Sequence, residues 1–111
     1  MSLRLVFHKP LFIPLKGEFY DAFERGDKRH EYRVAGPRWN ADTCWIGRAV
    51  TLSRGYGKAK RLCGEIVSFG VSNTPCKTAT WKQIYGERGP AAIIGIKVLR
   101  DNPSTQGERG E

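Results

Sequence analysis

The residues GDKRHEYR, at positions 26–33, decide how the rest of this sequence is interpreted. Gly26 follows a short amphipathic segment, and glycine most readily adopts the left-handed conformation with which helices often end. Beyond Gly26 the side chains alternate with the period of two that is typical of a strand. One face of this strand would carry Lys28, His30, Tyr32 and Val34, and the other Arg29, Glu31 and Arg33. We therefore predict a helix that passes directly into a charged strand.

Charged residues are unfavourable in most strands, so this composition needs an explanation. One interpretation is an exposed edge strand, in which charge prevents pairing with other sheets. The other is a strand that lines a polar cleft, where Lys28, Glu31 and Arg33 converge on a bound anion or base. The spacing of the residues leaves both interpretations open.

The motif resembles the signature of the ASCH domain, the activating-signal-cointegrator homology family. In this sequence the pattern Gly-x-Lys-x-x-Glu-x-Arg consists of Gly26, Lys28, Glu31 and Arg33, and it follows a helix that carries Phe19 and Phe23. The family has a small β-barrel related to the PUA RNA-binding fold, and the predicted strand order fits it up to Arg100. The resemblance implies a cleft lined by Lys28, Glu31 and Arg33 that takes a nucleic acid or a nucleotide.

The length and charge of the chain agree with one small, basic domain. We predict an ASCH-like barrel over residues 1–100 and a disordered polar tail over 101–111. The net charge of +8 and the pI of about 9.8 favour acidic partners, of which nucleic acid is the commonest. A generally basic protein without such a partner is the alternative.

The three cysteines, Cys44, Cys63 and Cys76, are odd in number and form no Cys-x-x-Cys pair. We therefore expect no disulfide framework and no metal site, and a reducing, cytoplasmic location is the simpler inference. Cys63 lies in an apolar run and is predicted to be buried. We expect no cofactor, no membrane span and no secretory signal. The sequence does not indicate the oligomeric state.

The remaining elements follow from apolar periodicity and from turn residues. A first helix over Gly17–Arg25 would place Phe19, Ala22 and Phe23 on its core face. A second, short helix would begin at Thr80 in a capping box with Gln83 and end at Gly86. Strands are predicted over residues 3–7, 11–13, 48–53, 62–71 and 91–99. Together they predict an α+β fold: a small mixed, partly open β-barrel with two short helices.

Two loops are candidate binding segments. Arg38 beside Trp39 suits contact with a phosphate and stacking on a base, or else Trp39 folds back and caps the barrel. The glycine-flanked Tyr56, within a basic run that includes Arg54 and Lys58, suits a hairpin that grips a phosphodiester backbone, or a solvated turn. No helix follows these glycines, so they are no dinucleotide-binding motif.

Glu65 lies among apolar neighbours in the predicted strand 62–71. A partly buried carboxylate needs a cationic or hydrogen-bonding partner, and Lys28 or Arg33 could supply one. Alternatively, Glu65 faces solvent.

Three functions remain open. The first, which we favour, is binding of nucleic acid, RNA rather than DNA, or of a nucleotide, by Lys28, Glu31, Arg33, Arg38, Trp39, Arg54, Tyr56 and Lys58. The second is an enzyme acting on modified nucleosides or RNA, with Lys28 and Glu31 as catalytic groups. Small bacterial members of the family that the motif resembles hydrolyse acylated cytidines with a lysine, a threonine and a glutamate. Here Glu31 stands where that threonine would align. The third is a regulator that binds an acidic protein.

Overall fold

The computed structural model describes residues 9–99 of the chain. Its elements are, in order, β1 (Leu11–Leu15), α1 (Gly17–Arg25), β2 (His30–Val34), β3 (Ala49–Arg54), β4 (Arg61–Ser72), the 3-10 helix η1 (Pro75–Lys77), α2 (Ala79–Tyr85) and β5 (Ala91–Val98). The predicted strand at 3–7 and the predicted tail at 101–111 lie outside the described residues. Every other predicted helix and strand is present, and the boundaries either agree with the prediction, as for Gly17–Arg25, or differ by one or two residues.

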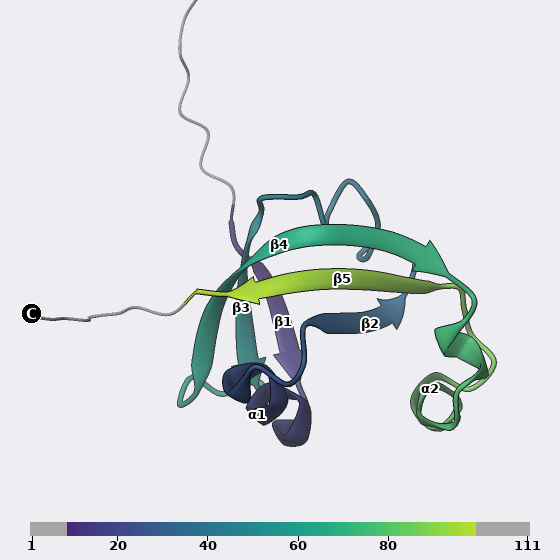
Figure 1. Ribbon diagram of the computed structural model, residues 1–111, viewed down its shortest axis with the longest axis horizontal. Helices are drawn as coiled ribbons and strands as arrows, with labels where there is room; N and C mark the ends of the chain where they lie inside the picture. The colour runs from purple at the N-terminus through teal and green to yellow at the C-terminus, as the bar shows by residue number, and fades with distance from the viewer. Residues whose placement is uncertain (1–8, 100–111) are drawn as a thin grey trace, which may run out of the picture.

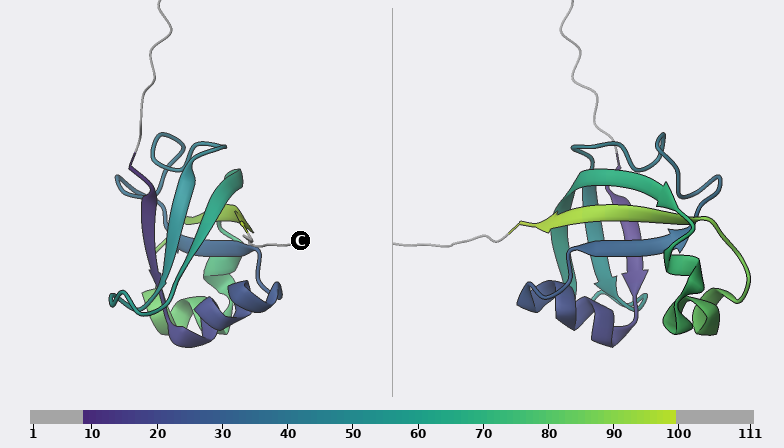
Figure 2. Two further views of the ribbon diagram at one scale, coloured as in Figure 1. Left: turned by 90° about the vertical axis from the view of Figure 1, so that its left-hand side faces the viewer. Right: turned by 45° about the vertical axis from the view of Figure 1, so that its right-hand side comes forward.

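The five strands form one strongly curled sheet, which makes an open half-barrel (Figure 1, Figure 2). Their order is β1-β3-β4-β5-β2. β1 pairs with β3 in parallel, and all other pairs are antiparallel. The α+β prediction of a small, mixed and partly open barrel is therefore confirmed, and the architecture is compatible with a PUA-like fold. Pro14 lies within β1, where the open edge of the sheet tolerates its missing N–H group.

A β-bulge in β4 changes which side chains face the core. The pairing of β4 with β5 shifts between Ile66 and Ser68, so Val67 is an extra residue on β4. Such an insertion reverses the alternation of side chains beyond it. Gly64 and Ile66 are buried before the bulge, and Phe69 packs against the core after it. Cys63 is exposed, so the prediction of a buried thiol was wrong, because its face of β4 points outward.

Helix α1 contributes two large side chains to the core. Tyr20 and Phe23 are almost completely buried, whereas the predicted face residues Phe19 and Ala22 are only partly buried. The helix ends at Gly26, whose φ of 89° is the left-handed conformation predicted from the sequence. The Gly26 N–H group is directed to the carbonyls of Ala22 and Phe23. The chain therefore leaves α1 in a fixed direction toward β2.

Helix α2 is attached to the end of β4 and packs beside β2 (Figure 1). Its N-cap is Thr78, whose hydroxyl accepts a hydrogen bond from the Trp81 N–H group at 3.1 Å. The predicted capping box at Thr80 was wrong, because the helix begins at Ala79 and already includes Thr80. Gly86 ends the helix as predicted. Within residues 9–99, neither helix is long and apolar enough to cross a lipid bilayer.

Candidate functional site

A cleft of about 480 Å³ opens between α1, the start of β2 and the η1–α2 segment. Aromatic side chains form much of its lining, and they come from all three of these regions: Phe19, Tyr32, Trp81 and Tyr85. The Trp81 and Tyr85 rings contact each other, with centroids 4.4 Å apart. Thr74, Thr78 and Thr80 add hydroxyl groups at the rim formed by η1 and α2. The cleft therefore combines aromatic faces with hydroxyl groups along one side.

Lys28 and Glu31 are the charged residues that line this cleft. The Lys28 Nζ lies 3.7 Å from Glu31 Oε1 and within 5.1–5.6 Å of the centroids of the Phe19, Phe23 and Tyr32 rings. A lysine ammonium above aromatic faces is attracted by the ring quadrupoles. The Lys28 cation is thus held by one carboxylate and three rings.

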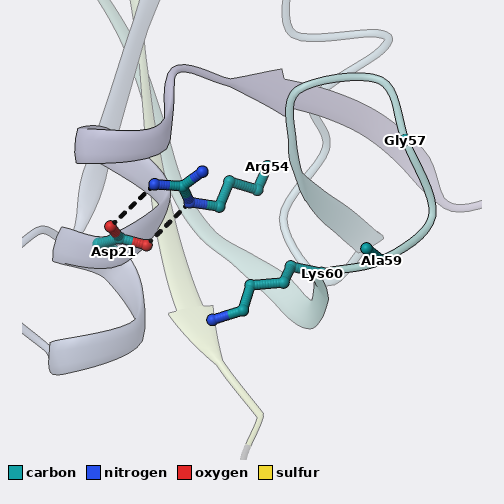
Figure 3. Close-up of a pocket in the computed structure, with 5 residues that line it drawn as sticks. All are labelled: Asp21, Arg54, Gly57, Ala59 and Lys60. Carbon is teal, nitrogen blue, oxygen red and sulfur yellow. Dashed lines mark hydrogen bonds and ion pairs between the residues drawn. The ribbon is translucent and has the colours of Figure 1, made fainter.

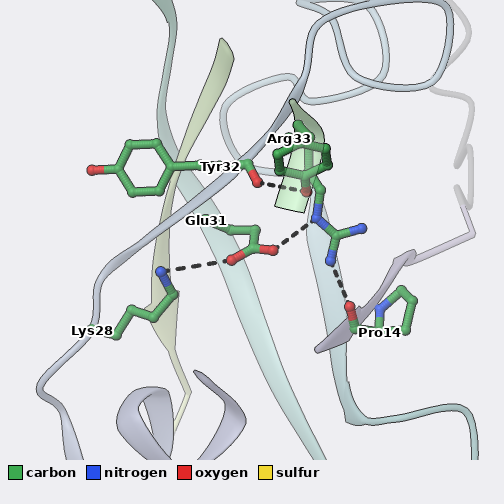
Figure 4. Close-up of polar contacts among 6 residues, drawn as sticks. Pro14, Lys28, Glu31, Tyr32 and Arg33 are labelled. Carbon is green, nitrogen blue, oxygen red and sulfur yellow. Dashed lines mark hydrogen bonds and ion pairs between the residues drawn. The ribbon is translucent and has the colours of Figure 1, made fainter. Parts of the chain in front are cut away.

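The alternation of a strand would have placed Lys28 and Glu31 on opposite faces, and this prediction was wrong. β2 begins only at His30, so Lys28 belongs to the turn that follows Gly26. The Lys28 N–H group donates to the Ala22 carbonyl at 3.2 Å, which keeps this turn against the end of α1. From there the Lys28 side chain reaches Glu31, as Figure 4 shows.

Arg33 holds Glu31 from the other side (Figure 4). Arg33 Nε donates to Glu31 Oε2 at 2.7 Å, and Arg33 Nη2 donates to the Pro14 carbonyl of β1 at 2.5 Å. The guanidinium carbon also lies 4.9 Å from the centroid of the Trp39 ring. Arg33 does not line the cleft. It positions the buried carboxylate of Glu31, which is only 6% exposed.

The environment of the cleft changes the acidity of two side chains. Burial lowers the pKa of Lys28, and the nearby Arg33 charge lowers it further, whereas Glu31 acts in the opposite direction. Burial also raises the pKa of Tyr85. The Tyr85 hydroxyl donates to the Tyr32 carbonyl at 3.3 Å, which joins α2 to β2. The uncharged forms of Lys28 and Tyr85 are therefore favoured relative to their forms in water.

Trp39 belongs to the core and does not reach the cleft. Its side chain is 8% exposed, and the Arg38 guanidinium lies over its ring at 5.2 Å. Of the two alternatives for Trp39, the structure has the one in which the ring folds back on the barrel. Trp39 offers no open face for stacking on a base, and Arg38 remains exposed beside it.

The β3–β4 hairpin lies beside α1, away from α2 (Figure 1). Tyr56 at its tip is 81% exposed, and Lys58 is also exposed. Arg54 instead turns toward α1, where its Nε and Nη2 atoms lie 3.2 and 3.3 Å from the carboxylate oxygens of Asp21 (Figure 3). The two residues line a separate cavity of about 260 Å³ together with Lys60. The hairpin is present as predicted, and its binding role stays a prediction.

Glu65 is not the partner of the cationic residues near the cleft. It lies opposite Lys97 in the β4–β5 ladder and is partly exposed. Glu31 is the carboxylate that Lys28 and Arg33 both contact. The buried acid beside Lys28 and Arg33 is therefore Glu31 of the motif, and not Glu65.

Sequence reasoning missed the contribution of α2 to the site. Trp81, Ile84 and Tyr85 share one apolar and aromatic face of this helix, a pattern that by itself indicates only packing on the barrel. In the structure Trp81 is buried and donates from Nε1 to the Arg88 carbonyl at 2.7 Å, while the same face of α2 forms one wall of the cleft. The aromatic spacing on α2 was the available signal.

Comparisons with protein-family models and with curated proteins find no match to this sequence. Among residues 9–99, no group of three or more histidine, cysteine, aspartate or glutamate side chains is placed to hold a metal ion. The geometry of the cleft offers aromatic faces for a flat ring, one ammonium donor, one carboxylate acceptor and the hydroxyl groups of three threonines.

Proposed function

We propose that the protein binds RNA or a nucleotide, and that the aromatic cleft receives a base. One observation carries the proposal: aromatic side chains from three separate segments surround a Lys28–Glu31 pair that faces into the same cleft. Apolar sites with a few convergent polar groups are the usual form of ligand sites in proteins. A nucleobase matches this combination because it has flat faces and a polar edge.

Each part of the cleft has a role in this proposal. Tyr32 and Tyr85 offer ring faces on which a base stacks, and such stacking is worth about 1–3 kcal/mol per base. Lys28 donates to a ring nitrogen or carbonyl oxygen of the base edge, and Glu31 accepts from an amino or imino group. Arg33 orients the Glu31 carboxylate through its charge-assisted hydrogen bond. All bases carry such donors and acceptors, so the cleft favours bases as a class.

Two further observations support the proposal. The Gly26, Lys28, Glu31 and Arg33 motif resembles that of the ASCH family, and the half-barrel is compatible with the PUA-like fold to which that family is related. The net charge of +8 favours a polyanion over a neutral partner. Since Lys28 is the cationic residue of the cleft lining, this charge acts mainly outside the cleft.

The test is a titration of wild type, Tyr32→Ala and Tyr56→Ala with ribonucleoside monophosphates. Intrinsic tryptophan fluorescence measures the binding. Tyr32 lines the cleft and is 37% exposed, so its removal takes away a stacking face without opening the core. We expect Tyr32→Ala to weaken binding about tenfold, which corresponds to about 1.4 kcal/mol. Tyr56→Ala is the matched control, because this exposed tyrosine lies on the hairpin. Equal affinities of wild type and Tyr32→Ala would refute the proposal.

A second function is favoured by the lowered pKa of Lys28. A lowered pKa leaves more of an amine in the unprotonated form that a general base needs, and Lys28 lies beside Glu31 at the wall of the cleft. In the hydrolysis of an acylated cytidine, Lys28 would take a proton from the attacking water. The oxygen would bond to the acyl carbon, the amide C–N bond would break, and the proton would pass to the departing amino group.

Incubation with N4-acetylcytidine, and separately with RNA, tests this second function. Release of acetate or cleavage of RNA by wild type, together with its loss in Lys28→Met, would support an enzyme. If wild type bound its ligand but turned over neither substrate, the enzymatic function would be refuted and the binding function would stand. Lys9→Met is the control, because Lys9 lies outside the cleft lining.

A further inference from the structure

We propose that Arg29, His30 and Lys97 form a phosphate-binding subsite next to the aromatic cleft, so that the ligand is a single-stranded polynucleotide. This inference rests on the proposed function, because it extends the same site from one base to the backbone that carries it.

A second groove, of about 430 Å³, runs along the start of β2 and the outer end of β5. Lys28 lines both this groove and the aromatic cleft, so the two are adjacent cavities that share one side chain. The groove is lined by Arg29 and His30 on one side and by residues 95–98 on the other. A ligand that occupies the cleft can therefore extend past Lys28 into the groove.

The charge of the groove differs from that of the cleft. Four of its lining residues are basic or ionisable, namely Lys28, Arg29, His30 and Lys97, and no carboxylate lines it. Arg29, His30 and Lys97 are exposed, and among the residues that the structure describes no ion pair involves them. The nearest acids by sequence and register are Glu31, which pairs with Lys28 and Arg33, Asp27, which pairs with Arg25, and Glu65, which lies opposite Lys97. Arg29 and Lys97 thus present positive charge that nearby carboxylates do not neutralise through an ion pair, and His30 adds an exposed imidazole beside them.

The backbone beneath these side chains is firmly held. The Ile96 N–H group donates to the Arg29 carbonyl at 2.8 Å, and His30 is the register partner of Gly95. Arg29 and Lys97 therefore project from neighbouring, hydrogen-bonded segments, and neither side chain takes part in the core. Exposed arginine and lysine side chains on a fixed backbone are the usual means by which proteins position a phosphodiester chain.

The combination of the two cavities selects the ligand. An aromatic cleft with an ammonium donor, a carboxylate acceptor and threonine hydroxyls suits a base, and an adjoining cationic groove suits the phosphates of neighbouring nucleotides. A duplex would keep its bases stacked away from the cleft, so the strand must be single. A free nucleoside would use the cleft and leave the groove empty.

The test compares wild type with Arg29→Ala/Lys97→Ala, using a fluorescein-labelled nine-nucleotide RNA, DNA of the same sequence, and unlabelled ribonucleosides. At about 50 mM salt we expect the double variant to bind both oligonucleotides about tenfold more weakly. The slope of log K against log salt is negative, and its magnitude should decrease by about 1.4. This is the loss of two phosphate contacts, each of which contributes about 0.7. Affinity for ribonucleosides should not change, because they carry no phosphate.

Lys9→Ala/Lys16→Ala is the matched control, because it removes two exposed lysines that line neither the cleft nor the groove. This control should retain the salt slope of wild type. If Arg29→Ala/Lys97→Ala kept wild-type affinity and slope while Tyr32→Ala weakened binding, the subsite would be wrong and the base cleft would stand. If wild type bound no oligonucleotide and no ribonucleoside, the proposed function would fail, and this inference with it. A loss confined to RNA would assign the contacts to the 2′-hydroxyl and overturn the phosphate assignment.

Discussion

Arg33 joins the two edges of the sheet through a hydrogen bond to Pro14. Arg33 lies on β2 and Pro14 on β1, the strands at opposite ends of the order β1-β3-β4-β5-β2. The Nη2 atom donates to the Pro14 carbonyl at 2.5 Å, while Nε of the same guanidinium donates to Glu31 at 2.7 Å. The Arg33 side chain therefore connects β1 and β2, which do not pair with each other. The same side chain also fixes the Glu31 carboxylate of the cleft.

We predict that Arg33→Ala destabilises the protein by about 3 kcal/mol, because it leaves the buried Glu31 carboxylate with only the longer Lys28 contact. Chemical denaturation monitored by circular dichroism measures the change in the free energy of unfolding. Arg38→Ala is the control, since Arg38 also lies over Trp39 but is exposed. It should cost no more than about 0.5 kcal/mol. Similar losses for both variants would refute the bridging role of Arg33.

The lowered pKa of Lys28 predicts a pH dependence of stability. Because folding lowers this pKa below 10.5, the unfolded chain binds more protons than the folded chain between the folded pKa and 10.5. The contribution of Lys28 to stability therefore rises with pH in that window and is constant outside it. We expect the free energy of unfolding of wild type minus that of Lys28→Met to rise as the pH approaches 10.5. Urea denaturation at a series of pH values measures it, and a falling difference would contradict the prediction.

Thr78 and Thr80 offer a test of how α2 is anchored. Thr78→Ala should cost about 1 kcal/mol, because it removes the N-cap acceptor for the Trp81 N–H group. Thr80 lies in the first turn of the same helix and does not cap it, so Thr80→Ala should leave the stability nearly unchanged. Thermal unfolding of the two variants measures the difference. If Thr80→Ala were the more damaging substitution, the helix would begin where the sequence alone predicted.

The β3–β4 hairpin should contribute to the binding of long RNA but not to the binding of a mononucleotide. Tyr56 and Lys58 are exposed on the β3–β4 hairpin and do not line the cleft, so we expect one nucleotide in the cleft to leave them untouched. We expect Tyr56→Ala/Lys58→Ala to leave mononucleotide affinity unchanged and to weaken binding of RNA long enough to pass around α1. Fluorescence anisotropy with RNAs of increasing length measures this. An equal affinity of wild type and variant for every length would show that the hairpin is only a solvated turn.

Local patterns predicted most of the fold. Gly26 marked the end of α1 because glycine readily adopts the left-handed conformation with which many helices end, and the apolar alternation of residues 91–99 predicted the interior strand β5. The bulge at Val67 could not be predicted in the same way, because an extra residue in β4 has meaning only against its partner β5. The exposure of Cys63 follows from the faces that this pairing gives to β4.

Only one wall of the cleft could be predicted from the sequence, because the other wall depends on contacts between distant segments. Lys28, Glu31 and Arg33 lie close together in the chain, so their motif was recognisable, although their division into cleft residues and a positioning residue was not. The opposite wall comes from α2, more than 40 residues later, and it is joined to β2 by the hydrogen bond from Tyr85 to the Tyr32 carbonyl. Trp39 was ambiguous because its burial depends on Arg33 and the folded barrel around it.

The most direct test of base binding in the aromatic cleft is an NMR titration of the ¹⁵N-labelled protein with a ribonucleoside monophosphate. We predict that the largest chemical-shift changes lie at Lys28, Tyr32, the Trp81 indole and Tyr85, with little change at residues 55–60 of the hairpin. Changes confined to the hairpin, or none at saturating nucleotide, would contradict the assignment of the cleft as the base-binding site.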